Sequence, residues 1–136
     1  MSYQESEQRI VEADAAARAG DHERARALYR EAAELQRAFV EAQPADRVRT
    51  KSIFGRSAAT LYYEAGDLDE AERFARSLLA EPWIEPGSAV KLRSLLQDIA
   101  DERAAGAAGV VRQRLRKLGV PRLRPSRRPL FRGVRP

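Results

Sequence analysis

The chain has 136 residues, enough for one domain with a modest core, and it lacks cysteine, which excludes a disulfide framework and cysteine-ligated metal. No N-terminal apolar run resembles a signal peptide or is long enough to span a bilayer, so we expect a cytoplasmic protein without a membrane span. The net charge of +5 is unevenly divided, because residues 112–136 carry ten basic and no acidic side chains while residues 1–111 carry 15 basic and 20 acidic ones. The acidic body and the basic tail therefore need separate explanations.

The first part of the chain predicts a helix hairpin. Ser2 and Glu5 form an S-x-x-E capping box before a helix over about residues 3–19. Gly20 suits the left-handed end of that helix, and Asp21 suits the cap of the next one. The second helix has an apolar stripe with helical spacing, which consists of Ala25, Leu28, Tyr29, Ala32, Leu35 and Phe39. Pro44 ends it.

A second hairpin follows, with the same types of capping and turn residues. Asp46 is the expected N-cap of the third helix, Gly66 its expected end, and Asp67 with Glu70 a capping pair for the fourth. The apolar positions of the third helix are Phe54, Ala58, Leu61, Tyr62 and Ala65, and those of the fourth are Leu68, Ala71, Phe74, Ala75 and Leu78. Pro82 breaks the fourth helix before a turn over residues 81–87.

The remaining sequence predicts one closing helix and a tail. Its pattern favours a helix over residues 88–103 with an apolar face of Ala89, Leu92, Leu95, Leu96 and Ile99. We expect a weakly ordered hinge at residues 104–109, which contain two glycines, then a short sixth helix with Val110, Val111, Leu115 and Leu118. The Pro/Arg-rich residues from 121 onward are expected to be disordered. The domains expected are thus 1–104, helical, and 105–136, hinge and basic tail.

One sequence motif occurs twice in similar form, as Ala-Gly-Asp-His-Glu-Arg-Ala at 19–25 and Ala-Gly-Asp-Leu-Asp-Glu-Ala at 65–71. The glycine turns the chain, the aspartate caps the second helix, and the alanine allows the helices to approach closely. Here the sequence resembles the tetratricopeptide repeat family: Gly20, Ala25, Tyr29 and Ala32 match its pattern, and so do Gly66 and Ala71. In the second copy Ala75 stands at the position of the aromatic residue, and Phe74 comes one position early. Residues 56–99 are also similar to small bacterial helical-hairpin proteins without an assigned activity.

The resemblance implies an all-α fold of the α-solenoid type, with two antiparallel tetratricopeptide-like hairpins and a capping helix. The two glycines are 46 residues apart, while the family period is near 34, so helices two and three should be longer than standard. Such arrays bury a continuous core only by stacking. We therefore expect self-association into an oligomer or a constitutive complex with a partner.

The resemblance also indicates where a partner binds. Tetratricopeptide arrays bind on the surface lined by the first helix of each hairpin, which here implies Asp14, Arg18, Arg56, Thr60 and Tyr63. Arg47, Arg49 and Lys51 add a basic group near the third helix, to which an acidic peptide can dock. Trp83 is either an exposed anchor for the partner or, as such residues more often are, a plug between hairpins. A solvated charged face is the plainer reading of each charged residue taken alone.

No combination of residues predicts catalysis. His22, the only histidine, lies at a hairpin turn without further metal ligands. Asp67, Asp69, Glu70 and Glu72 lie at a helix start, where carboxylates complement the helix dipole. The segment Gly55-Arg56-Ser57-Ala58-Ala59 is weakly similar to a nucleophile elbow but lies within a helical pattern. We expect a non-enzymatic protein that needs no metal or cofactor.

The sequence thus favours a protein–protein interaction scaffold or adaptor of tetratricopeptide type. The alternative is a nucleic-acid-associated protein whose tail neutralises phosphates or another acidic surface. The basic residues that would make those contacts are Arg112, Arg114, Arg116, Lys117, Arg122, Arg124, Arg127, Arg128, Arg132 and Arg135. Two interpretations without a binding partner also stay open: the tail folds back on the acidic body, or it is a solvated extension.

Overall fold

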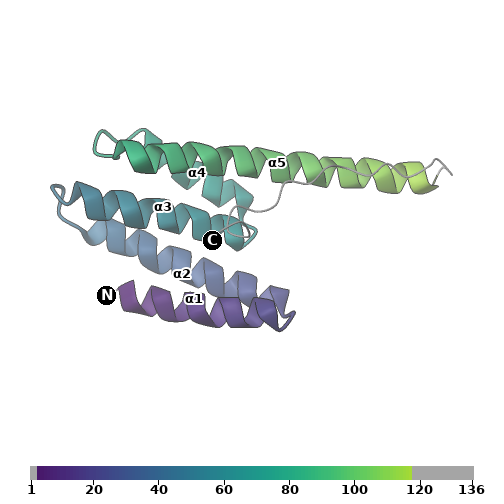
Figure 1. Ribbon diagram of the computed structural model, residues 1–136, viewed down its shortest axis with the longest axis horizontal. Helices are drawn as coiled ribbons and strands as arrows, with labels where there is room; N and C mark the ends of the chain where they lie inside the picture. Colours follow the sequence, from purple (N-terminus) through teal and green to yellow (C-terminus); the bar gives the residue numbers. More distant parts are fainter. Residues whose placement is uncertain (1–2, 118–136) are drawn as a thin grey trace. The chain divides into compact units, whose positions relative to one another are not determined.

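The computed structural model describes the backbone of residues 3–117 and the side chains of residues 3–107. These residues form five α-helices, namely α1 (Tyr3–Arg18), α2 (His22–Ala42), α3 (Val48–Glu64), α4 (Leu68–Leu79) and α5 (Pro86–Lys117) (Figure 1). The contacts within the chain fall into two units, residues 1–96 and 97–136, with the division inside α5. The all-α fold of two hairpins followed by a further helix, which the sequence predicts, is confirmed.

The two helix–helix corners that the repeated motif predicts are present and have the same geometry. Gly20 and Gly66 have φ values of 83° and 78°, a left-handed conformation that disfavours residues with a Cβ. After each glycine the aspartate N–H donates a hydrogen bond to the carbonyl five residues back, from Asp21 to Ala16 at 2.9 Å and from Asp67 to Tyr62 at 3.0 Å. This pattern is the Schellman motif, which satisfies the last carbonyls of the first helix in each hairpin.

The same aspartates then begin the second helix of each hairpin. The Asp21 carboxylate accepts a hydrogen bond from the Arg24 N–H at 3.2 Å, and the Asp67 carboxylate accepts one from the Glu70 N–H at 3.4 Å. Both are N-caps as predicted. One Gly-Asp pair therefore ends one helix and starts the next. The predicted capping box at the start of α1 includes Ser2, which lies outside the described residues.

Small side chains hold the helices together. Helix α1 packs on α2, α2 on α3, and α3 on α4. Ala13, Ala32, Ala58 and Ala71 are completely buried, and alanine lets helix backbones approach closely. At Gly55 an added Cβ would lie 3.0 Å from a terminal carbon of Leu78, so the α3–α4 contact has little spare room. Larger residues, among them Leu28, Tyr62, Phe74 and Leu78, complete the buried stripes.

The start of α3 differs from the prediction. Arg47, not Asp46, is the N-cap residue, and its side chain makes no capping hydrogen bond. The reason is a turn in which the Arg47 N–H donates to the Pro44 carbonyl at 3.0 Å, which places Asp46 inside the turn. Gln43, directly before the proline, is extended with ψ 145° and ends α2 as predicted.

Helix α5 differs more. It begins at Pro86 rather than near Ser88, because proline suits the first turn of a helix. It continues to Lys117, so the predicted hinge at 104–109 and the separate sixth helix are wrong. Alanine has the highest helix propensity, and the four alanines of this stretch offset the cost of about 1 kcal/mol for each glycine. No helix in the described part of the chain is both long and apolar enough to cross a membrane.

Candidate functional site

A partly exposed stripe runs along α3. Arg49, Ile53, Arg56 and Thr60 recur at spacings of four, three and four, which places them on one face of a helix. Arg49 is exposed, Ile53 is 37% exposed, and Arg56 and Thr60 are half-buried. The Thr60 Oγ1 donates to the Arg56 carbonyl at 3.0 Å, which fixes the hydroxyl against its own helix. We call these four residues the α3 stripe.

The α3 stripe carries positive charge that the described part of the chain does not neutralise. Helix α3 has no acidic residue before Glu64, its last position. Arg49 and Arg56 make no ion pair with any described residue. By contrast, Arg9 pairs with Glu31 at 3.1 Å and Arg37 pairs with Glu70 at 2.7 Å. The stripe is therefore a basic strip within a body that is acidic in composition.

Arg47 and Lys51, the other basic residues predicted near α3, do not share the face of the stripe. They are four residues apart, on a different side of the helix from Arg49 and Arg56. The Lys51 Nζ lies 4.5 Å from the centroid of the Trp83 ring, a cation–π contact, and the Glu85 N–H donates to Ser52 Oγ at 3.1 Å. The predicted basic group is therefore two separate features, and Trp83 is half-buried against one of them.

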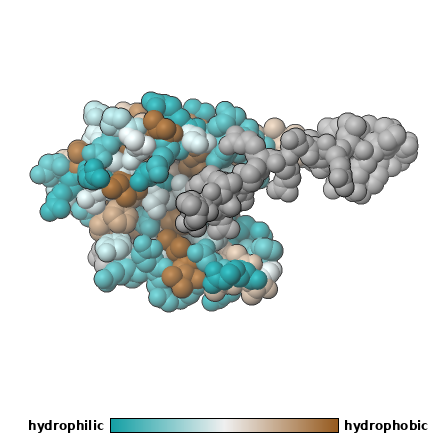
Figure 2. All heavy atoms as spheres, viewed as in Figure 1, coloured by the Kyte–Doolittle hydropathy of each residue, from teal (hydrophilic) through white to brown (hydrophobic). Residues whose placement is uncertain are grey.

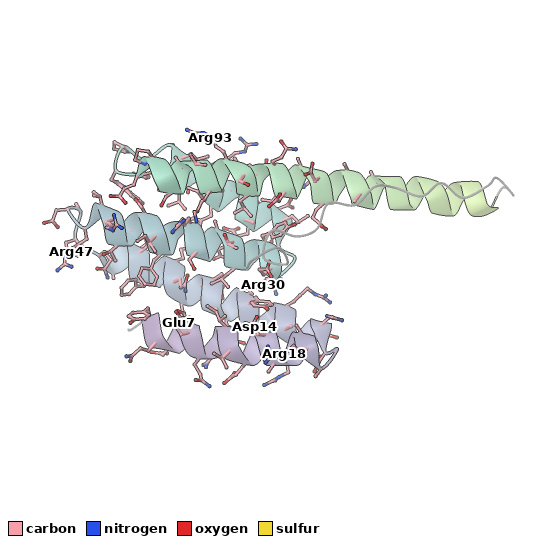
Figure 3. All side chains as sticks on the ribbon, viewed as in Figure 1. Glu7, Asp14, Arg18, Arg30, Arg47 and Arg93 are labelled. Atoms are coloured by element: carbon pink, nitrogen blue, oxygen red, sulfur yellow. The ribbon has the colours of Figure 1, made fainter. Side chains whose placement is uncertain are left out.

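The two predicted binding residues of α1 differ in exposure and in their contacts. Asp14 accepts a hydrogen bond from the Tyr29 hydroxyl of α2, so part of its carboxylate serves the first hairpin. Arg18 is exposed at the end of α1 (Figure 3). Glu7, seven residues before Asp14 and on the same side of the helix, is also exposed. Helix α1 therefore presents mainly acidic groups where α3 presents basic ones.

Tyr63 does not belong with the exposed residues. Its side chain is only 6% exposed, so it is part of the core and offers little surface to a partner. The resemblance to the tetratricopeptide family placed it with Arg56 and Thr60 on the first helix of the second hairpin. Tyr63 lies on the same face of α3 as Arg56, seven residues earlier, but this end of the face is covered, and Tyr63 is buried like its neighbours Tyr62 and Ala59.

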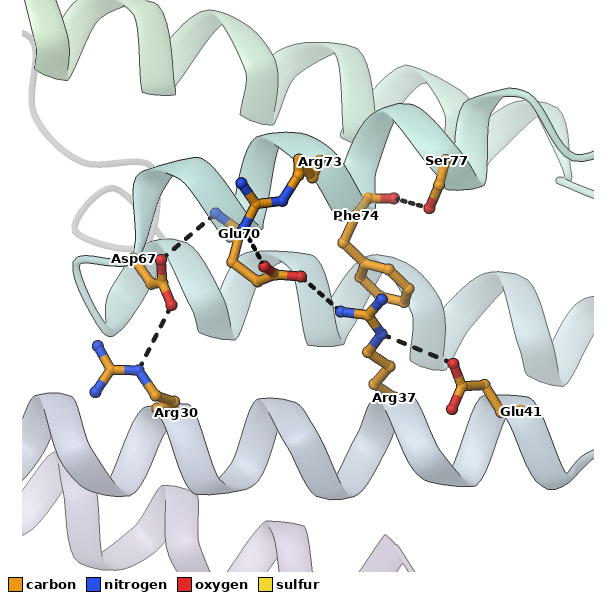
Figure 4. Close-up of polar contacts among 8 residues, drawn as sticks. All are labelled: Arg30, Arg37, Glu41, Asp67, Glu70, Arg73, Phe74 and Ser77. Atoms are coloured by element: carbon orange, nitrogen blue, oxygen red, sulfur yellow. Dashed lines mark hydrogen bonds and ion pairs between the residues drawn. The ribbon is translucent and has the colours of Figure 1, made fainter.

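An ionic seam between α2 and α4, which the sequence did not indicate, joins the two hairpins (Figure 4). Arg30 and Arg37, two turns apart on α2, face the first turn of α4. Arg30 lies 3.6 Å from Asp67, and Arg37 donates to Glu70 at 2.7 Å. The Arg37 guanidinium also lies 4.5 Å from the centroid of the Phe74 ring. The only sequence signal was the spacing of seven between the two arginines.

Glu70 is the centre of this seam. It accepts hydrogen bonds from Arg73 and Arg37, and these two cations hold the pKa of its carboxyl below the ordinary value of 4.5, Arg73 contributing most. Asp67 caps α4, and Glu72 pairs with Arg76 at 2.9 Å. The acidic cluster is therefore used for capping and ion pairs, as expected from its position at a helix start.

Three aromatic residues from three helices meet at the end of the first hairpin that is opposite the Gly20 corner. The ring centroids of Phe39 and Phe54 are 4.9 Å apart, and Tyr3 lies 5.5 Å from Phe54 and 6.2 Å from Phe39. Tyr3 is 44% exposed, while the two phenylalanines are half-buried. We call this group the aromatic cluster. The sequence placed each residue on its stripe but gave no sign that the three would meet.

The remaining candidates have local roles. His22 is the first residue of α2 and is exposed at the hairpin turn. The Gly55 to Ala59 segment lies within α3, so it has no strand-to-helix turn of the kind a nucleophile elbow needs. Among the described residues no three metal-ligating side chains come together.

The comparison with known families agrees with this geometry. The tetratricopeptide repeat model matches residues 7–31 and 55–77. The first segment covers most of α1, the Gly20 corner and the first half of α2, and the second covers most of α3, the Gly66 corner and most of α4. Both hairpins are tetratricopeptide-like. No curated protein and no solved structure matches the chain.

The tetratricopeptide-like segments are separated by residues 32–54. This stretch contains the end of α2, the Pro44 turn and the start of α3, and so accounts for the long spacing of the two glycine corners. It also contains Phe39 and Phe54 of the aromatic cluster. The added helical turns are therefore tied to the first hairpin by an aromatic contact.

Proposed function

We propose that this protein is a non-enzymatic adaptor whose two tetratricopeptide-like hairpins bind a protein partner through the exposed side of α1 and α3. The observation that carries the proposal is the α3 stripe, whose two arginines have no ionic partner in the described part of the chain. Proteins of this repeat class commonly serve as interaction scaffolds. The proposed surface consists of the exposed residues Arg18, Arg49 and Ile53 and the half-buried residues Arg56 and Thr60.

The proposal includes no catalytic step. The titratable groups that the sequence singled out cap helices, as Asp21 and Asp67 do, or form ion pairs, as Glu70 and Glu72 do. Asp14 is engaged by Tyr29. Each of these groups thus has a local structural partner, and the α3 stripe contains a threonine and arginines without an adjacent base.

In-cell photo-crosslinking tests the adaptor role. A benzophenone amino acid at position 60, on the α3 stripe, is compared with the same residue at position 27, an exposed site on α2. We expect one recurrent protein adduct from position 60 and none, or a different set, from position 27. Adducts that are absent or identical at both positions would rule out a docking role for this face.

A second candidate role rests on composition alone. The ten basic and no acidic residues of 112–136 suit sequence-independent binding of nucleic acid, with affinity that falls as salt rises. The test compares duplex DNA binding by the full chain with a full-length variant in which these ten residues are glutamine. We expect weaker binding and a shallower salt dependence in the variant. Equal binding and equal slopes would remove this role.

A further inference from the structure

We infer that the partner of the α3 stripe is an acidic helical segment that places an apolar residue between two carboxylates. The inference rests on the proposed function, since it names the chemistry of the partner for the same surface. It is carried by Arg49, Ile53 and Arg56, which present a cation, an exposed apolar side chain and a second cation in a row.

The charge of the stripe is the first argument. Cations in the first turn of a helix oppose the helix dipole, and α3 has Arg49 there and no acidic residue. Arg30 and Arg37 lie opposite carboxylates, whereas Arg24 and Arg93, like the stripe arginines, make no ion pair with a described residue. What sets Arg49 and Arg56 apart is that they share one helix face with the exposed side chain of Ile53 between them. They are complementary to carboxylates from another molecule.

The spacing is the second argument. Arg49 and Arg56 are seven residues apart, which is about 10 Å along the helix axis. A partner helix with carboxylates seven residues apart spans the same distance, and an apolar side chain four residues after the first carboxylate faces Ile53. The matching order is acidic, apolar, acidic. Planar guanidinium groups can bind carboxylates through two parallel hydrogen bonds, which adds geometric preference to the attraction.

The exposure of Ile53 is the third argument. Figure 2 shows one face of the molecule, on which hydrophobic residues lie in small groups among hydrophilic ones. Ile53, at 37% exposure, supplies a modest apolar contact that ion pairs must supplement. An apolar helix without charges would therefore gain little here, and a basic partner would be repelled.

Fluorescence anisotropy with two designed peptides tests the inference on the full-length protein. The first probe is a labelled helix-forming peptide with Glu, Leu and Glu at positions i, i+4 and i+7, and the second has Lys in place of both Glu residues. We expect Arg49→Glu with Arg56→Glu to weaken binding of the Glu peptide by roughly tenfold, since two attractions become repulsions. We also expect this double variant to bind the Lys peptide, which the wild-type protein does not.

The matched control reverses two arginines outside the stripe, Arg24 and Arg93, both of which are exposed. Arg24→Glu with Arg93→Glu changes the net charge by the same amount, so it measures the contribution of the basic tail and of overall charge. We expect this control to stay within about twofold of wild type for the Glu peptide. Circular dichroism spectra that overlay for all variants show that the helices are intact.

The outcomes separate this inference from the proposed function. Equal weakening by stripe and control variants, or failure of the Lys peptide to bind the stripe variant, overturns the acidic-helix inference. If position 60 still crosslinks to one protein in cells, the adaptor role stands with a partner of other chemistry. If the peptide behaves as expected but position 60 captures no protein, the stripe binds acidic helices and the proposed adaptor role fails.

Discussion

At the scale of single residues, the two glycine corners show how one backbone requirement determines a hairpin. Gly20 and Gly66 adopt a left-handed conformation so that Asp21 and Asp67 can close one helix and cap the next. A Cβ at Gly20 would meet nothing within 4 Å, so crowding does not explain the choice of residue there. The positive φ explains it.

Replacement of Gly66 tests this requirement. We expect Gly66→Ala to lower the free energy of unfolding by about 1 kcal/mol, because alanine is strained at positive φ and its Cβ would also lie 3.2 Å from Arg26 Cδ. Gly87→Ala is the control, since Gly87 lies in the first turn of α5 with open space around it, and it should be neutral or slightly stabilising. Urea denaturation measures both. Equal effects would show that the left-handed geometry is not what matters.

Glu70 gives a second prediction at this scale. Its folded-state pKa is depressed by Arg73 and Arg37, so its contribution is present above its unfolded pKa near 4.5 and is lost as the pH falls through the lower folded value. We expect Glu70→Gln to lower the urea midpoint at pH 7 and to have a much smaller effect at acidic pH. Urea titrations of both proteins across this range measure the difference.

The control for Glu70 is Glu41→Gln. Glu41 also faces Arg37, at 3.8 Å, but its side chain is 68% exposed, and such surface pairs contribute little. We expect a small effect on the midpoint that barely changes with pH. If Glu41→Gln reproduced the pH-dependent fall in the urea midpoint, the effect would come from any carboxylate beside Arg37 and not from Glu70 in particular.

At the scale of helices, the aromatic cluster explains how the added turns between the repeats are held. Phe39 lies in the last part of α2 and Phe54 in the first half of α3, and their centroids are 4.9 Å apart. Edge-to-face aromatic pairs contribute beyond the area they bury. The cluster thus fastens the non-repeat stretch to the start of α1, where Tyr3 completes it.

A double-mutant cycle tests this contact. We expect Phe39→Leu and Phe54→Leu each to destabilise the protein, and the double variant to lose less than the sum by about 0.5–1.5 kcal/mol, because the pair is already broken by either change. Free energies of unfolding from urea denaturation give the four corners of the cycle. Strict additivity would mean that the two rings do not interact in solution.

The helices also show what could be predicted from the sequence. The hairpin corners and the buried stripes were predictable because Gly-Asp pairs and three-four spacing act locally. The start of α3 was wrong by one residue because a turn from Pro44 to Arg47 competed with Asp46 as a cap. The predicted break at 104–109 is wrong because the high helix propensity of the alanines in this stretch outweighs the cost of its two glycines.

For the candidate site, the sequence grouped Arg56 with Thr60 and Arg49 with Arg56, but it did not identify Ile53. It joined Arg47 and Lys51 to them by proximity in sequence, whereas Lys51 lies against Trp83. It included Tyr63, which is buried. The seam and the aromatic cluster depend on which helices become neighbours in space, and spacing within one helix carries no such information.

At the scale of the whole molecule, two hairpins make a short array. Repeat arrays gain stability from stacked neighbours, and Val11, on the first helix, is 63% exposed. We therefore expect the purified protein to self-associate or to depend on its partner for stability. Light scattering after gel filtration, with thermal unfolding, measures this. A well-behaved monomer with a high unfolding temperature would contradict the expectation.

The claim on which the account depends is that the α3 stripe is a docking surface. The most direct measurement is calorimetric titration of the protein captured from position 60 into the full-length chain. We predict that Arg49→Glu with Arg56→Glu weakens binding by about tenfold or more, while Arg24→Glu with Arg93→Glu leaves it nearly unchanged. Binding that both pairs of substitutions affect equally would contradict the account.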